Sequence, residues 1–69
     1  MEIGKKIEYY RRKAFLTQED LAEEMNVSRQ TIYKWEHNLA YPELRKLEKL
    51  TTILNISFDE LLKTEEKKI

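Results

Sequence analysis

The sequence predicts an all-α fold of five short helices. A single glycine and a single proline occur among 69 residues, and 38% of the residues are charged, a composition typical of helices rather than sheets. Apolar residues recur at intervals of three and four, the spacing that gives a helix one buried face. A chain of this length holds one core. Because it has no cysteine, helix packing must supply the stability.

Composition also limits the classes of function. Lysine plus arginine and aspartate plus glutamate number 13 each, so the formal net charge is zero. That balance alone does not suggest a nucleic-acid partner. No apolar run approaches the roughly 18 residues of a membrane span, and no signal-peptide core opens the chain. We therefore expect a cytoplasmic protein with no membrane partner.

The first helix is expected from Glu2 to Lys13. The apolar residues at helical spacing on one side are Ile3, Ile7, Tyr10 and Ala14. Such spacing predicts that this side is buried. Gly4 falls inside the helix, where glycine costs roughly 1 kcal/mol relative to alanine.

Two further helices joined by a tight turn are expected between Gln18 and His37. Thr17 caps the first of them, and Asp20 three residues later gives a Thr-x-x-Asp variant of the capping box. Asn26 lies at the turn, where a residue that tolerates positive φ is needed. The residues expected to point inward are Leu21, Met25, Val27, Ile32 and Trp35, with the small Ala22 where the helices cross.

The second helix of this pair carries the residues most informative about function. Ser28 is a strong N-cap before it, and Asn38 is expected to end it in the left-handed conformation. Its exposed face holds Arg29, Gln30, Tyr33 and Lys34. Such side chains can read base edges in the major groove. The segment is therefore predicted to be a helix-turn-helix with a recognition helix over about residues 29–37.

A fourth and a fifth helix complete the predicted domain. Pro42 is expected at the first position of the fourth helix, where its missing N–H costs nothing. The buried stripe of that helix is predicted to be Leu44, Leu47, Leu50 and Leu54. Ser57 and Glu60 form a full capping box before the fifth helix, and Leu61 is expected to face the core.

One domain is expected over residues 1–62, followed by a polar tail, 63–69, that frays. Catalysis is not expected, because His37 is the only histidine and no phosphate-binding glycine loop or nucleophile–base pair can be identified. The sequence also predicts no metal site and no cofactor.

From Ile3 to Leu62 the chain resembles the Cro/CI-type helix-turn-helix regulators, also called the Xre family. The resemblance rests on LTQEDLAEEMNVSRQTIYKWE at 16–36, a proline-led helix at 42–54 and NISFDELL at 55–62. It implies a compact lambda-repressor-like DNA-binding domain in which helices 2 and 3 form the helix-turn-helix. It further implies a transcriptional regulator, most often a repressor, that binds double-stranded operator DNA as a homodimer in a prokaryotic cytoplasm, associated with the nucleoid.

The resemblance assigns DNA contacts to individual residues. Gln18 matches the family's phosphate-contacting glutamine. Arg29 and Gln30 match base-reading positions, where arginine suits guanine and glutamine suits adenine. Tyr33 and Lys34 lie a turn further along the same face. The expected phosphate contacts are Thr31, His37, Asn38 and Tyr41. The alternative is that this face is merely solvated, with Tyr33 packed against Tyr41.

The resemblance also implies a structural ion pair between Arg11 and Glu36, which would tie the first helix to the recognition helix.

Acidic residues cluster at Glu19, Asp20, Glu23 and Glu24. They favour the helix dipole and solubility. In some relatives the positions of Glu19 and Glu23 contact RNA polymerase, so this partner stays open.

Dimerisation in this family often uses the fifth helix and the loop before it. The candidate interface residues here are Ile56, Phe58 and Leu62; the alternative is that they only cap the core.

One departure from the family pattern is Phe15, which stands where glycine is common, although a bulky residue at positive φ costs about 1–2 kcal/mol. Either the first loop takes another path or packing of Phe15 offsets the strain.

A second class of function stays open at this point. The fold could serve as a protein-binding module, of the antitoxin or anti-repressor type, that has lost operator binding. Zero net charge favours this interpretation. The polar third helix opposes it, because a protein interface would expose more apolar area.

Overall fold

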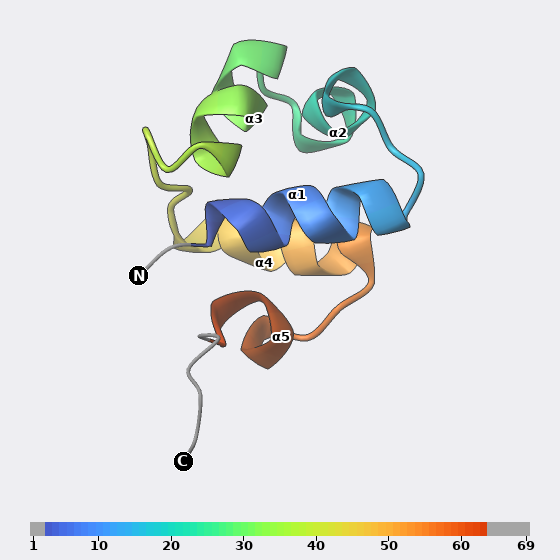
Figure 1. Cartoon of the computed structure of the whole chain (residues 1–69), viewed down its shortest axis with the longest axis vertical. Helices are drawn as coiled ribbons and strands as arrows, with labels where there is room; N and C mark the ends of the chain where they lie inside the picture. Colours follow the sequence, from blue (N-terminus) through green and yellow to red (C-terminus); the bar gives the residue numbers. More distant parts are fainter. Residues whose placement is uncertain (1–2, 64–69) are drawn as a thin grey trace.

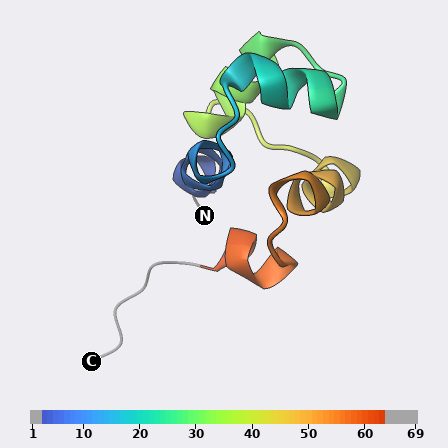
Figure 2. The same cartoon turned by 90° about the vertical axis from the view of Figure 1, so that its right-hand side faces the viewer.

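The computed structural model describes residues 3–63, and in this range it is all-helical. The helices are α1 (Gly4–Lys13), α2 (Gln18–Met25), α3 (Arg29–Glu36), α4 (Leu44–Leu54) and α5 (Phe58–Leu62). In Figure 1, α2 and α3 lie above α1, and α5 lies below it; the turned view in Figure 2 keeps this order. No helix of the described range is long and apolar enough to cross a membrane.

One core joins all five helices. Its buried apolar residues are Ile3, Ile7, Leu21, Ala22, Met25, Ile32, Trp35, Leu47, Leu50, Leu54 and Leu61. The prediction that Trp35 belongs to the core rather than to an exposed face is confirmed, since only 4% of it is accessible. Val27 is half-buried against the same cluster.

The buried side of α1 differs from the prediction at its end. Ala14 is exposed, because α1 ends at Lys13 and Ala14 is already the C-cap. The position one turn after Ile7 is instead taken by the buried Arg11. The predicted start at Glu2 lies outside the described residues, within which the helix begins at Gly4.

Three asparagines end helices in the left-handed region, as expected for a residue that replaces glycine there. Asn26 ends α2 at φ 62°, Asn38 follows α3 at φ 58° and Asn55 ends α4 at φ 58°. The predicted roles of Asn26 and Asn38 are confirmed. The capping box of α2 is also present: Thr17 N–H donates to Asp20 Oδ2, and Asp20 N–H donates to Thr17 Oγ1, each over 2.9 Å.

Phe15 adopts the strained conformation without compensation from packing. Its φ is 61°, and 92% of its surface is exposed, so both explanations expected from the sequence are wrong. Phe15 N–H donates to Arg12 O and Leu16 N–H donates to Arg11 O, which is the hydrogen-bond pattern of a Schellman motif. This turn therefore requires a left-handed residue at position 15.

The start of α4 lies two residues later than predicted. Pro42 is fully buried and precedes Glu43, which is the N-cap with extended backbone. Burial of the proline ring, rather than helix initiation, decides its place. Leu44 is then the first helical residue and is 62% exposed, so its assignment to the buried stripe is wrong, whereas Leu47, Leu50 and Leu54 are buried.

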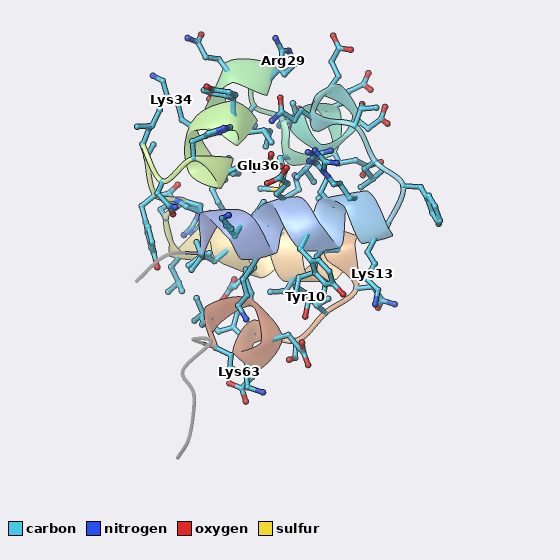
Figure 3. All side chains as sticks on the ribbon, viewed as in Figure 1. Tyr10, Lys13, Arg29, Lys34, Glu36 and Lys63 are labelled. Carbon is cyan, nitrogen blue, oxygen red and sulfur yellow. The ribbon has the colours of Figure 1, made fainter. Side chains whose placement is uncertain are left out.

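α5 is attached through Leu61, which is fully buried as predicted. Ser57 Oγ accepts from Glu60 N–H over 3.0 Å, which is one half of the predicted capping box. The Glu60 carboxylate accepts a hydrogen bond of 2.5 Å from the Tyr10 hydroxyl of α1 instead. In Figure 3, Tyr10 extends from α1 toward α5. The predicted polar tail lies outside the described residues apart from Lys63.

Candidate nucleic-acid interface

The outer face of α3 carries the residues that the sequence indicated as readers of DNA. Arg29, Gln30, Tyr33 and Lys34 are all exposed. Figure 3 shows Arg29 at the start of α3 and Lys34 pointing away from the other helices. Since successive positions along this set are one or three residues apart, all four lie on one side of the helix.

The start of α3 is fixed by its own side chains. Ser28 Oγ accepts from Thr31 N–H over 3.1 Å, and the two hydroxyl oxygens lie 3.0 Å apart. This cap supports the predicted helix start. Thr31 is half-buried, but its hydroxyl lies in an exposed contact with the Ser28 cap at the start of α3.

Arg11 and Glu36 form the ion pair that the family resemblance implied. Arg11 Nε lies 2.5 Å from Glu36 Oε2, and Nη2 lies 3.2 Å from Oε1. The side chains are 9% and 1% exposed. Arg11 Nη1 also donates to Leu16 O over 2.8 Å. The pair therefore links α1, the α1–α2 turn and α3, and Figure 3 shows Glu36 between α3 and α1.

A hydrogen-bond chain leads from this ion pair to the surface. Gln18 Nε2 donates to Glu36 Oε1 over 2.9 Å, and Gln18 Oε1 accepts from Arg29 Nη1 over 3.1 Å. The carboxylate can only accept and the guanidinium can only donate, so the orientation of the Gln18 amide is determined. Gln18 thus holds the guanidinium of Arg29 while itself being held by a buried charge.

The start of α2 lines an open hollow of about 480 Å³. Three arginines line it, Arg11, Arg12 and Arg29, together with Gln18 and Glu19. Free backbone N–H groups at a helix start and nearby cations together suit a phosphate. Arg12 is not among the residues that the sequence singled out. Its position on the exposed side of α1, directly after the buried Arg11 and one turn before Leu16, could have indicated it.

Tyr33 packs against His37 rather than standing alone. Their rings stack at a centroid distance of 4.0 Å and an interplanar angle of 26°, and His37 Nδ1 lies 3.0 Å from Tyr33 O. His37 is the C-cap of α3 rather than its last residue. Tyr33 stays 43% exposed, so the stacked pair remains accessible on the α3 face. Tyr41 is 55% exposed in the following loop.

Asn38 joins the end of α3 to the start of α1. Its Oδ1 accepts from Gly4 N–H over 3.1 Å. A Cβ on Gly4 would lie 2.4 Å from Glu36 O and 2.7 Å from Trp35 O, distances that real Cβ atoms do not tolerate. Gly4 is therefore required by the close approach of α1 to α3. The sequence showed only that a glycine inside a helix is unfavourable and did not reveal this reason for it.

The acidic residues of α2 lie on its exposed side. Glu19, Glu23 and Glu24 are solvent-exposed. The pKa of the exposed Asp20 is lowered, first by the hydrogen bond from the Thr17 backbone N–H and second by the Thr17 side chain. Asp20 is thus committed to the capping box, which leaves the glutamates as the acidic groups free for a partner.

The three candidate dimer residues differ in exposure. Phe58 is 37% exposed, whereas Ile56 and Leu62 are half-buried against the core. Ile56 also lines a hollow of about 390 Å³ between the ends of α1 and α4. Within the described residues, Phe58 is thus the candidate that contributes least to the core.

Comparison with known proteins identifies the fold and the family. The model of the helix-turn-helix family matches residues 7–61. The HTH-type transcriptional activator BcrR of Enterococcus faecalis is 41% identical over 66 residues, which are 96% of this chain and 32% of BcrR. This chain therefore spans about a third of the length of that relative.

Two DNA complexes are similar in structure. SinR, the master regulator for biofilm formation, was solved with DNA; it gives a TM-score of 0.79 at 33% identity, covering 87% of this chain and 97% of that one. The P22 c2 repressor with a synthetic operator gives 0.83 at 32%, covering 91% and 96%. With the family model spanning most of α1 through α5, this chain belongs to the Cro/CI-type helix-turn-helix family.

Proposed function

We propose that the chain is the DNA-reading domain of a transcriptional regulator and that α3 enters the major groove of double-stranded operator DNA. The observation that carries this proposal is the chain Arg11–Glu36–Gln18–Arg29. A solvated surface arginine is not usually connected to a buried carboxylate. A base-reading arginine gains specificity when its guanidinium plane is held in one orientation, as Gln18 holds that of Arg29.

The contacts divide into reading and positioning groups. Arg29 matches the two acceptors of guanine, and Gln30 matches the donor and acceptor of adenine. Tyr33 and Lys34 extend the same face, with Tyr33 suited to a thymine methyl group. Phosphates are expected in the hollow at the start of α2 and along the α3–α4 loop; the groups proposed to contact them are Arg12, Gln18, Thr31, His37, Asn38 and Tyr41.

A homodimer is part of the proposal. One domain reads few bases, and a second copy related by two-fold symmetry doubles the contacts. We place the interface on Ile56, Phe58 and Leu62, because these apolar groups retain accessible surface. Two recognition helices would then lie about 34–36 Å apart, one turn of DNA.

The regulatory outcome follows from what the bound domain covers. We propose repression, in which the bound dimer blocks a promoter. One observation favours activation as a second candidate: the 41% identical relative BcrR is named an activator, and Glu19 and Glu23 are exposed on α2. In that case these carboxylates would contact RNA polymerase. Loss of activation in a Glu19→Ala/Glu23→Ala variant with unchanged operator affinity would support this candidate, and retained activation would exclude it.

Selection from a random-sequence DNA library at two salt concentrations tests the proposed function. We expect enrichment of a two-fold-symmetric site and an affinity that falls steeply as salt rises. Absence of enrichment from folded protein at low salt would contradict DNA reading and favour a protein-binding module.

The Arg29→Ala variant tests the base-reading role on the selected site. We expect a loss of about 1–3 kcal/mol of binding free energy, with discrimination relaxed at one base pair. Arg45→Ala is the matched control, because Arg45 is an exposed arginine of α4. A uniform loss across all sequences in Arg29→Ala would instead assign the residue to phosphate.

A further inference from the structure

The junction between α1 and the end of α3 is unusually close. Gly4 is buried, and the space that a Cβ would need is filled by the carbonyl oxygens of Trp35 and Glu36. Directly after this point the chain turns at Asn38, whose φ is 58°. The side chain of Asn38 returns to α1 and its Oδ1 accepts from Gly4 N–H over 3.1 Å.

This hydrogen bond determines which atoms of the Asn38 carboxamide remain available to another partner. A backbone N–H can only donate, so the group beside Gly4 must be the carbonyl oxygen of the amide and not its nitrogen. The two Nδ2 hydrogens then lie on the other side of the amide, on a residue that is exposed. Phosphate oxygens only accept, so an outward Nδ2 suits a phosphate and an outward Oδ1 would repel it.

Asn38 also has a matching residue elsewhere in the chain. Asn55 ends α4 at the same φ of 58°. Both asparagines serve the left-handed turn, but only Asn38 follows the proposed recognition helix. A glycine at position 38 would satisfy the turn and leave Gly4 N–H without this acceptor, so the turn alone does not explain the Asn38 side chain.

We propose that Gly4 is a positioning residue for DNA binding, because its N–H and its lack of a Cβ hold the Asn38 amide with Nδ2 directed at a backbone phosphate. This inference rests on the proposed function and adds to it a link from α1 to the DNA backbone. Asn38 is the contacting residue, and Gly4 acts through it. The contact carries no net charge and is independent of base sequence.

The first experiment measures affinity for a random-sequence duplex of about two helical turns at low salt, where phosphate contacts dominate. Asn38→Gly keeps the left-handed turn and removes the amide; we expect about tenfold weaker binding. Asn38→Asp keeps the acceptor for Gly4 N–H but replaces the donor with a negative charge, and we expect it to bind more weakly still. A purely structural Asn38 would leave the affinity of folded Asn38→Gly within about twofold of the unmodified chain, and that result would overturn the proposal.

Asn55→Gly and Asn55→Asp are the matched controls, since they make the same changes of turn and charge at the end of α4. We expect both to leave the affinity for the duplex within about twofold of the unmodified chain. Equal losses at positions 38 and 55 would show a general effect of stability or charge and would overturn the proposal.

A double-mutant cycle tests whether Gly4 acts through Asn38. We expect Gly4→Ala to weaken binding in the unmodified chain and to have little further effect in the Asn38→Gly background. Additive losses would overturn the positioning role. Thermal unfolding of each variant confirms that the folded protein is compared.

A measurement on the unmodified chain covers the case in which Gly4→Ala does not fold. In two-dimensional NMR, addition of the duplex should shift the Asn38 side-chain NH₂ signals while the Gly4 amide stays protected from exchange. Unmoved Asn38 signals with bound duplex would overturn this inference alone. Absence of any binding by the unmodified chain would overturn it together with the proposed function.

Discussion

The α1–α3 region and the α4–α5 region share one apolar core, but the α1–α3 region adds buried polar contacts to it. The first contains the buried pair Arg11–Glu36 and the hydrogen bonds of Gln18. The second contributes the apolar side chains of Leu47, Leu50, Leu54 and Leu61 to the core. Between α1 and α5, the Tyr10 hydroxyl donates an exposed hydrogen bond to the Glu60 carboxylate.

Apolar packing and buried polar contacts contribute differently to the stability of the domain and to the orientation of its helices. Burial of apolar surface is non-directional and supplies most of the folding free energy. A buried ion pair gives little net stability, because desolvation offsets its attraction, but it allows only a narrow range of geometries. The buried polar contacts lie at the helix that must be oriented precisely if it reads DNA. Helices α4 and α5, for which a firm attachment is enough, contribute Leu47, Leu50, Leu54 and Leu61 to the core.

The largest expected effect comes from a substitution that removes the buried ion pair of the α1–α3 region. Glu36→Gln leaves the guanidinium of Arg11 buried without its counter-charge, so we expect a loss of about 3–5 kcal/mol in the free energy of unfolding. Urea denaturation measures it. Glu8→Gln is the control, because it removes the exposed pair between Glu8 and Arg12 and should cost less than about 1 kcal/mol. Equal effects of the two variants would contradict the distinction between buried and exposed pairs.

The next effect tests the apolar region. Leu61→Ala removes a fully buried side chain, for which we expect a loss of about 2–5 kcal/mol. Leu44→Ala changes the same residue type at a position that is 62% exposed and should cost less than about 1 kcal/mol. Both variants should keep the DNA affinity of the folded fraction, measured by titration under conditions where each is folded. Loss of affinity in folded Leu61→Ala would show that α5 also orients α3.

A stabilising change is expected at the turn between α1 and α2, which contains Phe15. Phe15→Gly removes the Cβ at φ 61° and should raise the free energy of unfolding by about 1 kcal/mol. For a domain of this size that corresponds to roughly 4–8 °C in melting temperature. Phe15→Ala retains the Cβ and should gain far less. If Phe15→Ala gained as much, exposure of the ring rather than backbone strain would be the cause.

The smallest effect concerns acid stability. Because the pKa of Asp20 is lower in the folded chain than its ordinary value of 3.8, folding favours the carboxylate. Its contribution is complete above the unfolded value and disappears as pH falls through the lower folded value. Asp20→Asn should therefore be less stable than the unmodified chain at neutral pH, and the two should converge in acid. A constant difference in denaturation midpoint across this range would contradict the charge-based explanation.

The helix pattern could be predicted from sequence because its signals are local. Thr17, Asp20, Asn26 and Ser28 act within a few residues of their own positions, and the helix-turn-helix follows from them. The start of α4 could not be predicted in this way, because the full burial of the Pro42 ring depends on tertiary packing. The local sequence is the same whether a proline opens a helix or lies two residues before its start, as Pro42 does.

The sequence by itself determined the five helices, the N-caps of α2 and α3 and the polar face of α3, since these depend on backbone preferences and residue spacing. Only the tertiary structure decided that Arg11 lies in the core, that Gln18 connects Glu36 to Arg29, and that Gly4 lies against the end of α3. These contacts join residues that are far apart in the chain. Their geometry depends on how whole helices pack, which no local pattern of residues encodes.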